Sequence, residues 1–133
     1  MGAAVLRFLW RFRFSFLVAV IIFYVSIIRI PSPVKALLFP GADKVAHFLL
    51  FLIQSVAVML EGVCRMRPSQ CGFSVSFCLI FLLPALYGGL IELLQQYCFP
   101  PRTGEWLDFF SDLAGALLAF LIYSLFVRKE ETP

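Results

Sequence analysis

Four long apolar stretches dominate this sequence, and short connections rich in proline and basic residues separate them. Each stretch is about 17–27 residues long, and about 20 apolar residues let an α-helix cross the hydrocarbon core of a membrane. The stretches predict transmembrane helices at about 8–29, 43–62, 73–99 and 104–127. Because the connections are short, consecutive helices should be antiparallel neighbours. The expected fold is all-α: one polytopic membrane domain over residues 1–133, built as a four-helix bundle.

The composition excludes several other classes of protein. Of all residues, 62% are hydrophobic and 14% are charged, whereas soluble domains are about 45–50% apolar and about 25% charged. The net charge of +3 comes without a basic stripe, so we expect no nucleic-acid partner. The four cysteines show no metal-binding spacing and suggest no disulfide framework. The N-terminus resembles a signal peptide without a cleavage site, which favours an uncleaved first helix.

The distribution of lysine and arginine predicts the orientation. In the expected topology, seven basic residues lie on one side of the membrane: Arg7, Arg11, Arg13, Arg65, Arg67, Arg128 and Lys129. Four lie on the other side: Arg29, Lys35, Lys44 and Arg102. Since cytoplasmic loops carry the excess of basic residues, both termini are predicted to be cytoplasmic.

Polar residues concentrate where the second helix starts, the third ends and the fourth starts, all on the outer side. The candidate binding residues there are Asp43, Lys44, His47, Glu92, Gln95, Arg102, Glu105, Asp108 and Asp112. Several are three or four residues apart, which places their side chains on one face of a helix. Charges inside a membrane are costly and usually face the interior of a bundle. We therefore expect an outward-opening polar pocket shared by three helices, with Asp112 close to Glu92 or His47.

Three segments, DKVAHFLLF, LYGGLIELLQ and RTGEWLDFFSDLAGALLA, resemble in this order the characteristic blocks of the VanZ-like family of small bacterial membrane proteins. The matching positions are Asp43, Lys44, His47, Tyr87, Gly88, Glu92, Gln95, Arg102, Glu105, Asp108, Asp112 and Gly115. Two positions depart from the family pattern: Glu105 stands where Asp is usual, and Asp112 stands where Asn is usual. The resemblance implies a bacterial inner-membrane location and a role in envelope maintenance or in resistance to the glycopeptide teicoplanin.

Two classes of function fit these residues. In the first, a non-enzymatic protein binds a membrane lipid or a lipid-linked envelope precursor at the polar pocket. In the second, a membrane enzyme uses Glu92, His47 and Asp108 for acid–base or metal-assisted chemistry on such a lipid. The chain has a single histidine and no nucleophile motif, which favours binding, and we expect neither a cofactor nor a metal.

Each of these residues also has a possible structural role. Asp108 and Asp112 could form a charge network with Arg102 and Lys44 that holds the helices together, and Arg102 could anchor at the interface or bind a lipid phosphate. Glu61 is expected to be a charge at the membrane interface. The small residues Ser111, Gly115 and Ala119 form a row that allows close approach of another helix, within the chain or in an oligomer. Pro84 predicts a kink in the third helix, and the fourth helix is expected to start near Thr103.

Overall fold

The structure is a computed structural model that describes residues 2–28, 39–65, 72–99 and 104–130. Within these ranges the chain is helical and contains no strand, which confirms the all-α prediction for this part of the chain. The elements in chain order are α1 (Gly2–Arg11), α2 (Arg13–Ile27), α4 (Ala42–Glu61), the 3-10 turn η1 (Val63–Arg65), α5 (Phe73–Phe77), the π-helical segment η3 (Cys78–Leu82), α6 (Leu83–Cys98) and α7 (Trp106–Glu130).

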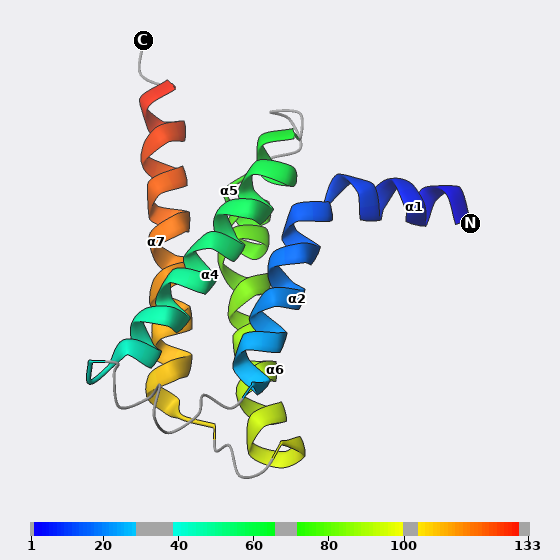
Figure 1. The fold of residues 1–133 in the computed structure, drawn as a ribbon. Helices are drawn as coiled ribbons and strands as arrows, with labels where there is room; N and C mark the ends of the chain where they lie inside the picture. Colours follow the sequence, from blue (N-terminus) through cyan, green and yellow to red (C-terminus); the bar gives the residue numbers. More distant parts are fainter. Residues whose placement is uncertain (1, 29–38, 66–71, 100–103, 131–133) are drawn as a thin grey trace.

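The helices α2, α4, α6 and α7 run roughly alongside one another in alternating directions (Figure 1). The start of α4, the end of α6 and the start of α7 lie at the same end of the bundle, as the sequence predicts. Helix α4 packs mainly along α7 and also against α2. This arrangement brings the three helix ends that carry polar residues together.

Three helical segments are long and apolar enough to cross a membrane: Ala42–Arg65, Phe73–Cys98 and Trp106–Phe126. Helices α1 and α2 supply a fourth span only if the bent pair is counted as one. Many large apolar side chains on these segments are exposed, among them Leu90, Leu93, Leu107 and Leu125. An exposed apolar surface of this extent suits contact with lipid chains. The chain thus has three apolar helices that could span a membrane, and up to four.

The first helix differs from the prediction. We expected one continuous helix at about 8–29, but the chain bends by 74° between α1 and α2. The bend lies at Phe12, which has non-helical backbone angles (φ −107°, ψ 25°). Helix α1 therefore projects sideways from the bundle, as Figure 1 shows at the N-terminus.

A hydrogen-bonded junction with the end of α4 holds this bend. The Glu61 carboxylate accepts hydrogen bonds from the backbone N–H groups of Phe14 (3.1 Å) and Ser15 (2.8 Å) and from the Ser15 hydroxyl (2.8 Å). The Arg11 guanidinium donates to the backbone carbonyls of Glu61 and Gly62. Each helix end thereby satisfies the unpaired backbone groups of the other. Glu61 is buried at this junction and is not the interfacial charge that its sequence position suggests.

The third predicted helix is one span of 26 residues, Phe73–Cys98, with an internal irregularity. The π-helical segment η3 ends immediately before α6, and Pro84 occupies the first turn of α6. Proline lacks an N–H group, and its ring crowds the carbonyl four residues earlier. In an apolar helix, a local π-helical adjustment can pair again the backbone groups that a proline leaves free. The expected disturbance at Pro84 is therefore present as a local π-helical turn.

The small-residue row of α7 supports close packing against α4. A Cβ atom added at Gly115 would overlap the backbone carbonyl oxygen of Phe48 and would lie 2.9 Å from the backbone nitrogen of Leu52. Ala119, one turn further along, is 1% exposed. Because Gly115 and Ala119 are both buried, their small size allows α7 to pack closely within this chain. The close approach predicted for this row is confirmed between α7 and α4.

Candidate functional site

Charged side chains from three helices meet at the shared end of α4, α6 and α7. We call them the polar cluster: Asp43, Lys44, His47, Glu92, Glu105, Asp108 and Asp112. His47, Glu92, Asp108 and Asp112 are all less than 10% exposed, whereas Asp43 and Glu105 are exposed. Buried charges of this kind need partners, since an unpaired charge in an apolar environment is strongly unfavourable. The pairing within the cluster therefore determines which of its polar atoms remain available to a ligand.

Lys44 connects α4 to the start of α7. Its ammonium group donates to Glu105 Oε2 at 2.7 Å and to Asp108 Oδ1 at 2.7 Å. The Lys44 side chain is 30% exposed and that of Asp108 is 7% exposed, so the ion pair reaches from the surface into the cluster. Charge-assisted hydrogen bonds of this length are among the stronger interactions in proteins. The predicted pairing of Asp108 with Lys44 is confirmed.

His47 lies deeper in the bundle than Lys44 and contacts Asp112, the second aspartate of α7. Its Nδ1 atom is 2.9 Å from Asp112 Oδ1, and its Nε2 atom is 4.0 Å from Asp108 Oδ2. The Asp112 side chain is fully buried. The predicted proximity of Asp112 to His47 is confirmed, and both aspartates point into the bundle. This pairing fixes the orientation of the imidazole ring, as a carboxylate partner commonly does.

Glu92 joins the cluster from α6 and also holds the start of α7. Its Oε2 atom accepts a hydrogen bond of 2.8 Å from the backbone N–H of Glu105, just before α7 begins at Trp106. The backbones are close here, because a Cβ added at Gly104 would lie 2.6 Å from the Glu92 carbonyl oxygen. A carboxylate is favourable beside a helix N-terminus, where N–H groups lack partners. Helix α7 starts slightly later than predicted, and Thr103 lies outside the described residues.

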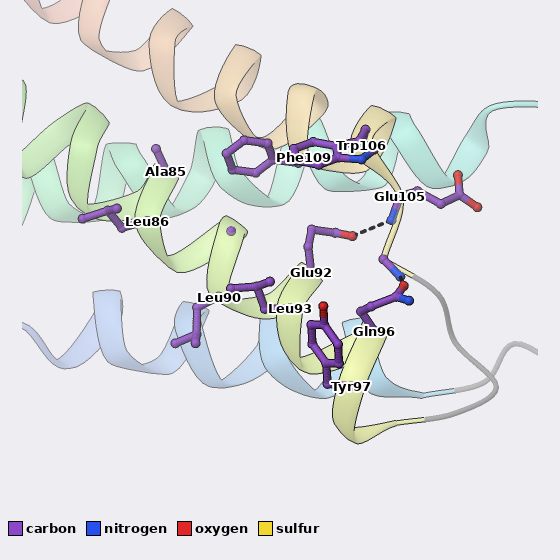
Figure 2. Close-up of a pocket in the computed structure, with 12 residues that line it drawn as sticks. Ala85, Leu86, Leu90, Glu92, Leu93, Gln96, Tyr97, Glu105, Trp106 and Phe109 are labelled. Carbon is purple, nitrogen blue, oxygen red and sulfur yellow. Dashed lines mark hydrogen bonds between the residues drawn. The ribbon is translucent and has the colours of Figure 1, made fainter.

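A pocket of about 680 Å³ lies between α6 and the first turn of α7. We call it the α6–α7 pocket, and Figure 2 shows the side chains that surround it. Its apolar lining comes from Ala85, Leu86, Gly89, Leu90, Leu93, Tyr97, Trp106 and Phe109, and its polar lining from Glu92, Gln96, Gly104 and Glu105. Tyr97 and Trp106 are both more than three-quarters exposed, at 78% and 77%. The pocket is therefore apolar along its length and polar where it meets the cluster.

Not every predicted site residue joins the cluster. Gln95 is buried, but its amide donates a hydrogen bond of 2.8 Å to the backbone carbonyl of Ser26, so it connects α6 to α2. This placement corrects the prediction that Gln95 lines the polar pocket, and its cause is the rotation of α6 relative to α2. Arg102 lies outside the described residues. Its pairing with the aspartates therefore stays a prediction.

Apart from Glu92, Gln96 and Glu105, the residues that line the α6–α7 pocket carry no charged or amide side chain that marks them in the sequence. Gly89 and Phe109 lie next to each other in its lining: a Cβ added at Gly89 would lie 3.4 Å from Phe109 Cε2, which is ordinary van der Waals contact. A glycine in an apolar helix opposite large side chains could have suggested a space between helices. Leu90 and Leu93 carry no such signal, because leucines that face lipid and leucines that line a pocket look alike in sequence.

We compared the chain with protein-family models, curated proteins and solved structures, and found no match in any of the three. The fold and the site therefore rest on the geometry described above.

Proposed function

We propose that this chain is a non-enzymatic, VanZ-like protein of the bacterial envelope that binds a lipid or lipid-linked precursor in the α6–α7 pocket. One observation carries the proposal: an apolar pocket of about 680 Å³ ends at the buried carboxylate of Glu92. An amphiphile has the matching form, with an apolar chain and a polar head. Ligand sites commonly combine an apolar lining with a few polar groups that orient the ligand.

The apolar part of the lining supports an acyl or isoprenyl chain as its occupant. Leu86, Leu90 and Leu93 lie on the side of α6 that borders the pocket, and each is more than half exposed (Figure 2). A lipid could enter from the membrane through this side without leaving its apolar environment. Burial of apolar chain surface is worth about 25 cal/mol per Å², so a partly covered chain would contribute several kcal/mol.

The polar end favours a headgroup that is rich in hydrogen-bond donors. One oxygen of Glu92 and one of Glu105 are already paired, with the Glu105 N–H and with Lys44. The Glu105 side chain is 52% exposed, so its carboxylate is the one open to a headgroup, and carboxylate oxygens accept hydrogen bonds when ionised. Gln96 is the remaining polar side chain of the lining, and its Oε1 atom already accepts a hydrogen bond from the Gly104 N–H. Hydroxyl, amide or amine groups of a sugar, peptide or aminated phospholipid head would complement these acceptors. This chemistry agrees with the envelope role that the family resemblance implies, including a link to teicoplanin resistance.

Filling the pocket should displace the lipid. We expect Gly89→Leu to weaken lipid binding about tenfold, a loss of about 1.4 kcal/mol, and so to lower the fraction of protein that carries co-purified lipid. A Cβ at Gly89 meets only Phe109, at 3.4 Å, so the larger side chain enters the pocket without striking the backbone. Native mass spectrometry of the detergent-purified protein measures the bound fraction.

The matched control is Ala114→Leu, which adds an apolar side chain at an exposed position of α7 outside the pocket lining. It should carry as much lipid as the parent protein. Equal lipid occupancy in Gly89→Leu and Ala114→Leu would contradict binding in this pocket. If the parent converts the lipid to a product and His47→Ala leaves it intact, the result would instead support the alternative, that the protein is an enzyme.

The proposal includes four membrane spans with both termini in the cytoplasm of a bacterial inner membrane. We expect a cysteine at position 39 (Phe39→Cys) to react with a membrane-impermeant maleimide in intact spheroplasts. Phe39 is 62% exposed, and its carbonyl accepts a hydrogen bond from the N–H of Ala42, the first residue of α4, so it lies at the end of α4 that carries Asp43, Lys44 and His47. The exposed Cys64, near the opposite end of α4, should react only after permeabilisation. The experiment uses variants that retain one reporter cysteine each, and the reverse labelling pattern would overturn the orientation.

A further inference from the structure

Three side chains at the centre of the polar cluster form an arrangement that lipid binding does not explain. His47 from α4, Glu92 from α6 and Asp112 from α7 each place a nitrogen or carboxylate oxygen within 4.8 Å of those of the other two. Their exposed fractions are only 6%, 9% and 0%. Three potential metal ligands from three helices thus converge in the interior of the bundle.

Two oxygen atoms of this group have no hydrogen-bond partner among the described residues. They are Glu92 Oε1 and Asp112 Oδ2, and both are inaccessible to solvent. The other oxygen of each carboxylate is paired, with the Glu105 N–H and with His47. A buried polar atom without a partner is unfavourable by about 1–3 kcal/mol, and by more when it is charged. A cation bound between the carboxylates would remove this cost.

One of the three ligand spacings matches a small divalent transition metal, and the other two lie within 4.8 Å. Zinc binds histidine nitrogen at about 2.0–2.1 Å and carboxylate oxygen at about 2.0–2.2 Å, so neighbouring ligand atoms lie about 3 Å apart. His47 Nδ1 and Asp112 Oδ1 are already 2.9 Å apart. The imidazole nitrogen favours zinc over magnesium and calcium, which prefer ligand sets made only of oxygen.

We propose that His47, Glu92 and Asp112 bind one divalent transition-metal ion, with Zn²⁺ as the best match. Three protein ligands leave a coordination position open for water or another ligand. Glu92 also lines the α6–α7 pocket, whereas His47 and Asp112 do not, so the proposed metal site adjoins the pocket through Glu92 alone. The inference does not depend on the proposed function, because the ion needs no lipid in order to bind.

A second group of potential ligands, Asp43, His47 and Asp108, also lies within 4.8 Å. It is the weaker candidate for two reasons. Asp108 already forms a 2.7 Å ion pair with Lys44, and a metal ion would have to compete with that cation. Asp43 is exposed and gains little from binding an ion. Both groups contain His47. Only this second group contains Asp43 and Asp108, and only the proposed site contains Glu92 and Asp112, so substitutions at these residues show which group binds the ion.

The sequence predicts no metal site, because it has one histidine and lacks a short metal-binding motif. Short motifs place two ligands on one helix, four residues apart. Here each ligand comes from a different helix, and the three positions span more than sixty residues of sequence. No spacing rule can detect such a site.

The test uses the detergent-purified full chain, with any affinity tag removed and metals stripped by a chelator. Isothermal titration with Zn²⁺ should show one ion per chain. We expect His47→Ala, Glu92→Gln and Asp112→Asn each to weaken binding at least about tenfold, a loss known even for residues that only orient metal ligands. Asp43→Asn is the control and should bind like the parent.

Titration with Co²⁺ gives a readout on the parent protein that requires no variant to fold. The site should give the intense visible absorption bands of a four- or five-coordinate ion, and His47, the single histidine of the chain, supplies the imidazole ligand. Failure of the parent to bind Zn²⁺, or a weak six-coordinate Co²⁺ spectrum, would overturn the proposal. Undiminished binding in folded Glu92→Gln and Asp112→Asn, or loss of binding in Asp43→Asn, would overturn it as well.

Discussion

Replacing Gly115 with leucine should destabilise the protein by about 3 kcal/mol or more, the upper range for overpacking in a well-packed interior. The reason is that the new side chain meets backbone and not a movable side chain. Its Cβ atom would overlap the carbonyl oxygen of Phe48 and lie 2.9 Å from the nitrogen of Leu52. Helices α4 and α7 would have to separate, and α4 carries Lys44 and His47 of the polar cluster. Reversible unfolding in mixed detergent micelles measures the change in the free energy of unfolding.

Ala114→Leu is the matched control for this substitution as well. Ala114 precedes Gly115 in the sequence, but it lies on an exposed side of α7. The control gains a side chain of the same kind without facing α4, so its free energy of unfolding should stay within about 0.5 kcal/mol of the parent value. If Gly115→Leu also unfolds like the parent, then α4 and α7 do not pack at this glycine.

Replacing Asp112 with leucine should cost about 3–5 kcal/mol, the usual consequence of removing one partner of a buried pair. Asp112 is fully buried, and its removal leaves the equally enclosed His47 without its 2.9 Å partner. The space between position 112 and Gly88 is also narrow, since a Cβ built on Gly88 would lie only 2.8 Å from Asp112 Oδ2. The branched side chain of leucine would therefore crowd Gly88. The experiment measures the unfolding free energy in the presence of a chelator, so that loss of a metal ion does not contribute.

Asp112→Asn separates the loss of the polar partner from the loss of charge. Asparagine has nearly the same shape, and its side-chain oxygen can accept a hydrogen bond from His47 Nδ1–H. We therefore expect this variant to lose less than about 1.5 kcal/mol, the usual net contribution of one hydrogen bond. If Asp112→Leu and Asp112→Asn are equally stable, His47 does not depend on this contact for the stability of the fold.

The two destabilising substitutions act on different parts of one assembly. Gly115 sets how closely α4 approaches α7, and Asp112 pairs with a histidine on that same α4. The sites are less than one helical turn apart on α7, so their effects should not be additive. Helix packing and polar pairing are thus coupled in this bundle.

Much of the fold and part of the site follow from the sequence by itself. Long apolar stretches have to form helices in a membrane, because unpaired backbone groups are too costly in lipid. Charged residues at helix ends have to face one another and not lipid, which predicted the convergence of His47, Asp108 and Asp112. The same argument predicted that Lys44 pairs with Asp108. These conclusions depend only on length, polarity and helical spacing.

Other features depended on the tertiary structure. Helical spacing shows which residues share a face, but it does not show which neighbouring helix that face meets. The rotation of α6 turns Gln95 toward Ser26 on α2, while Glu92 turns toward α7. Contacts with Glu61, far away in sequence, hold the bend after α1. The α6–α7 pocket and the convergence of His47, Glu92 and Asp112 likewise require three helices to be placed in space. Sequence determined the helices and their polar ends, and packing between distant segments decided which of those groups meet.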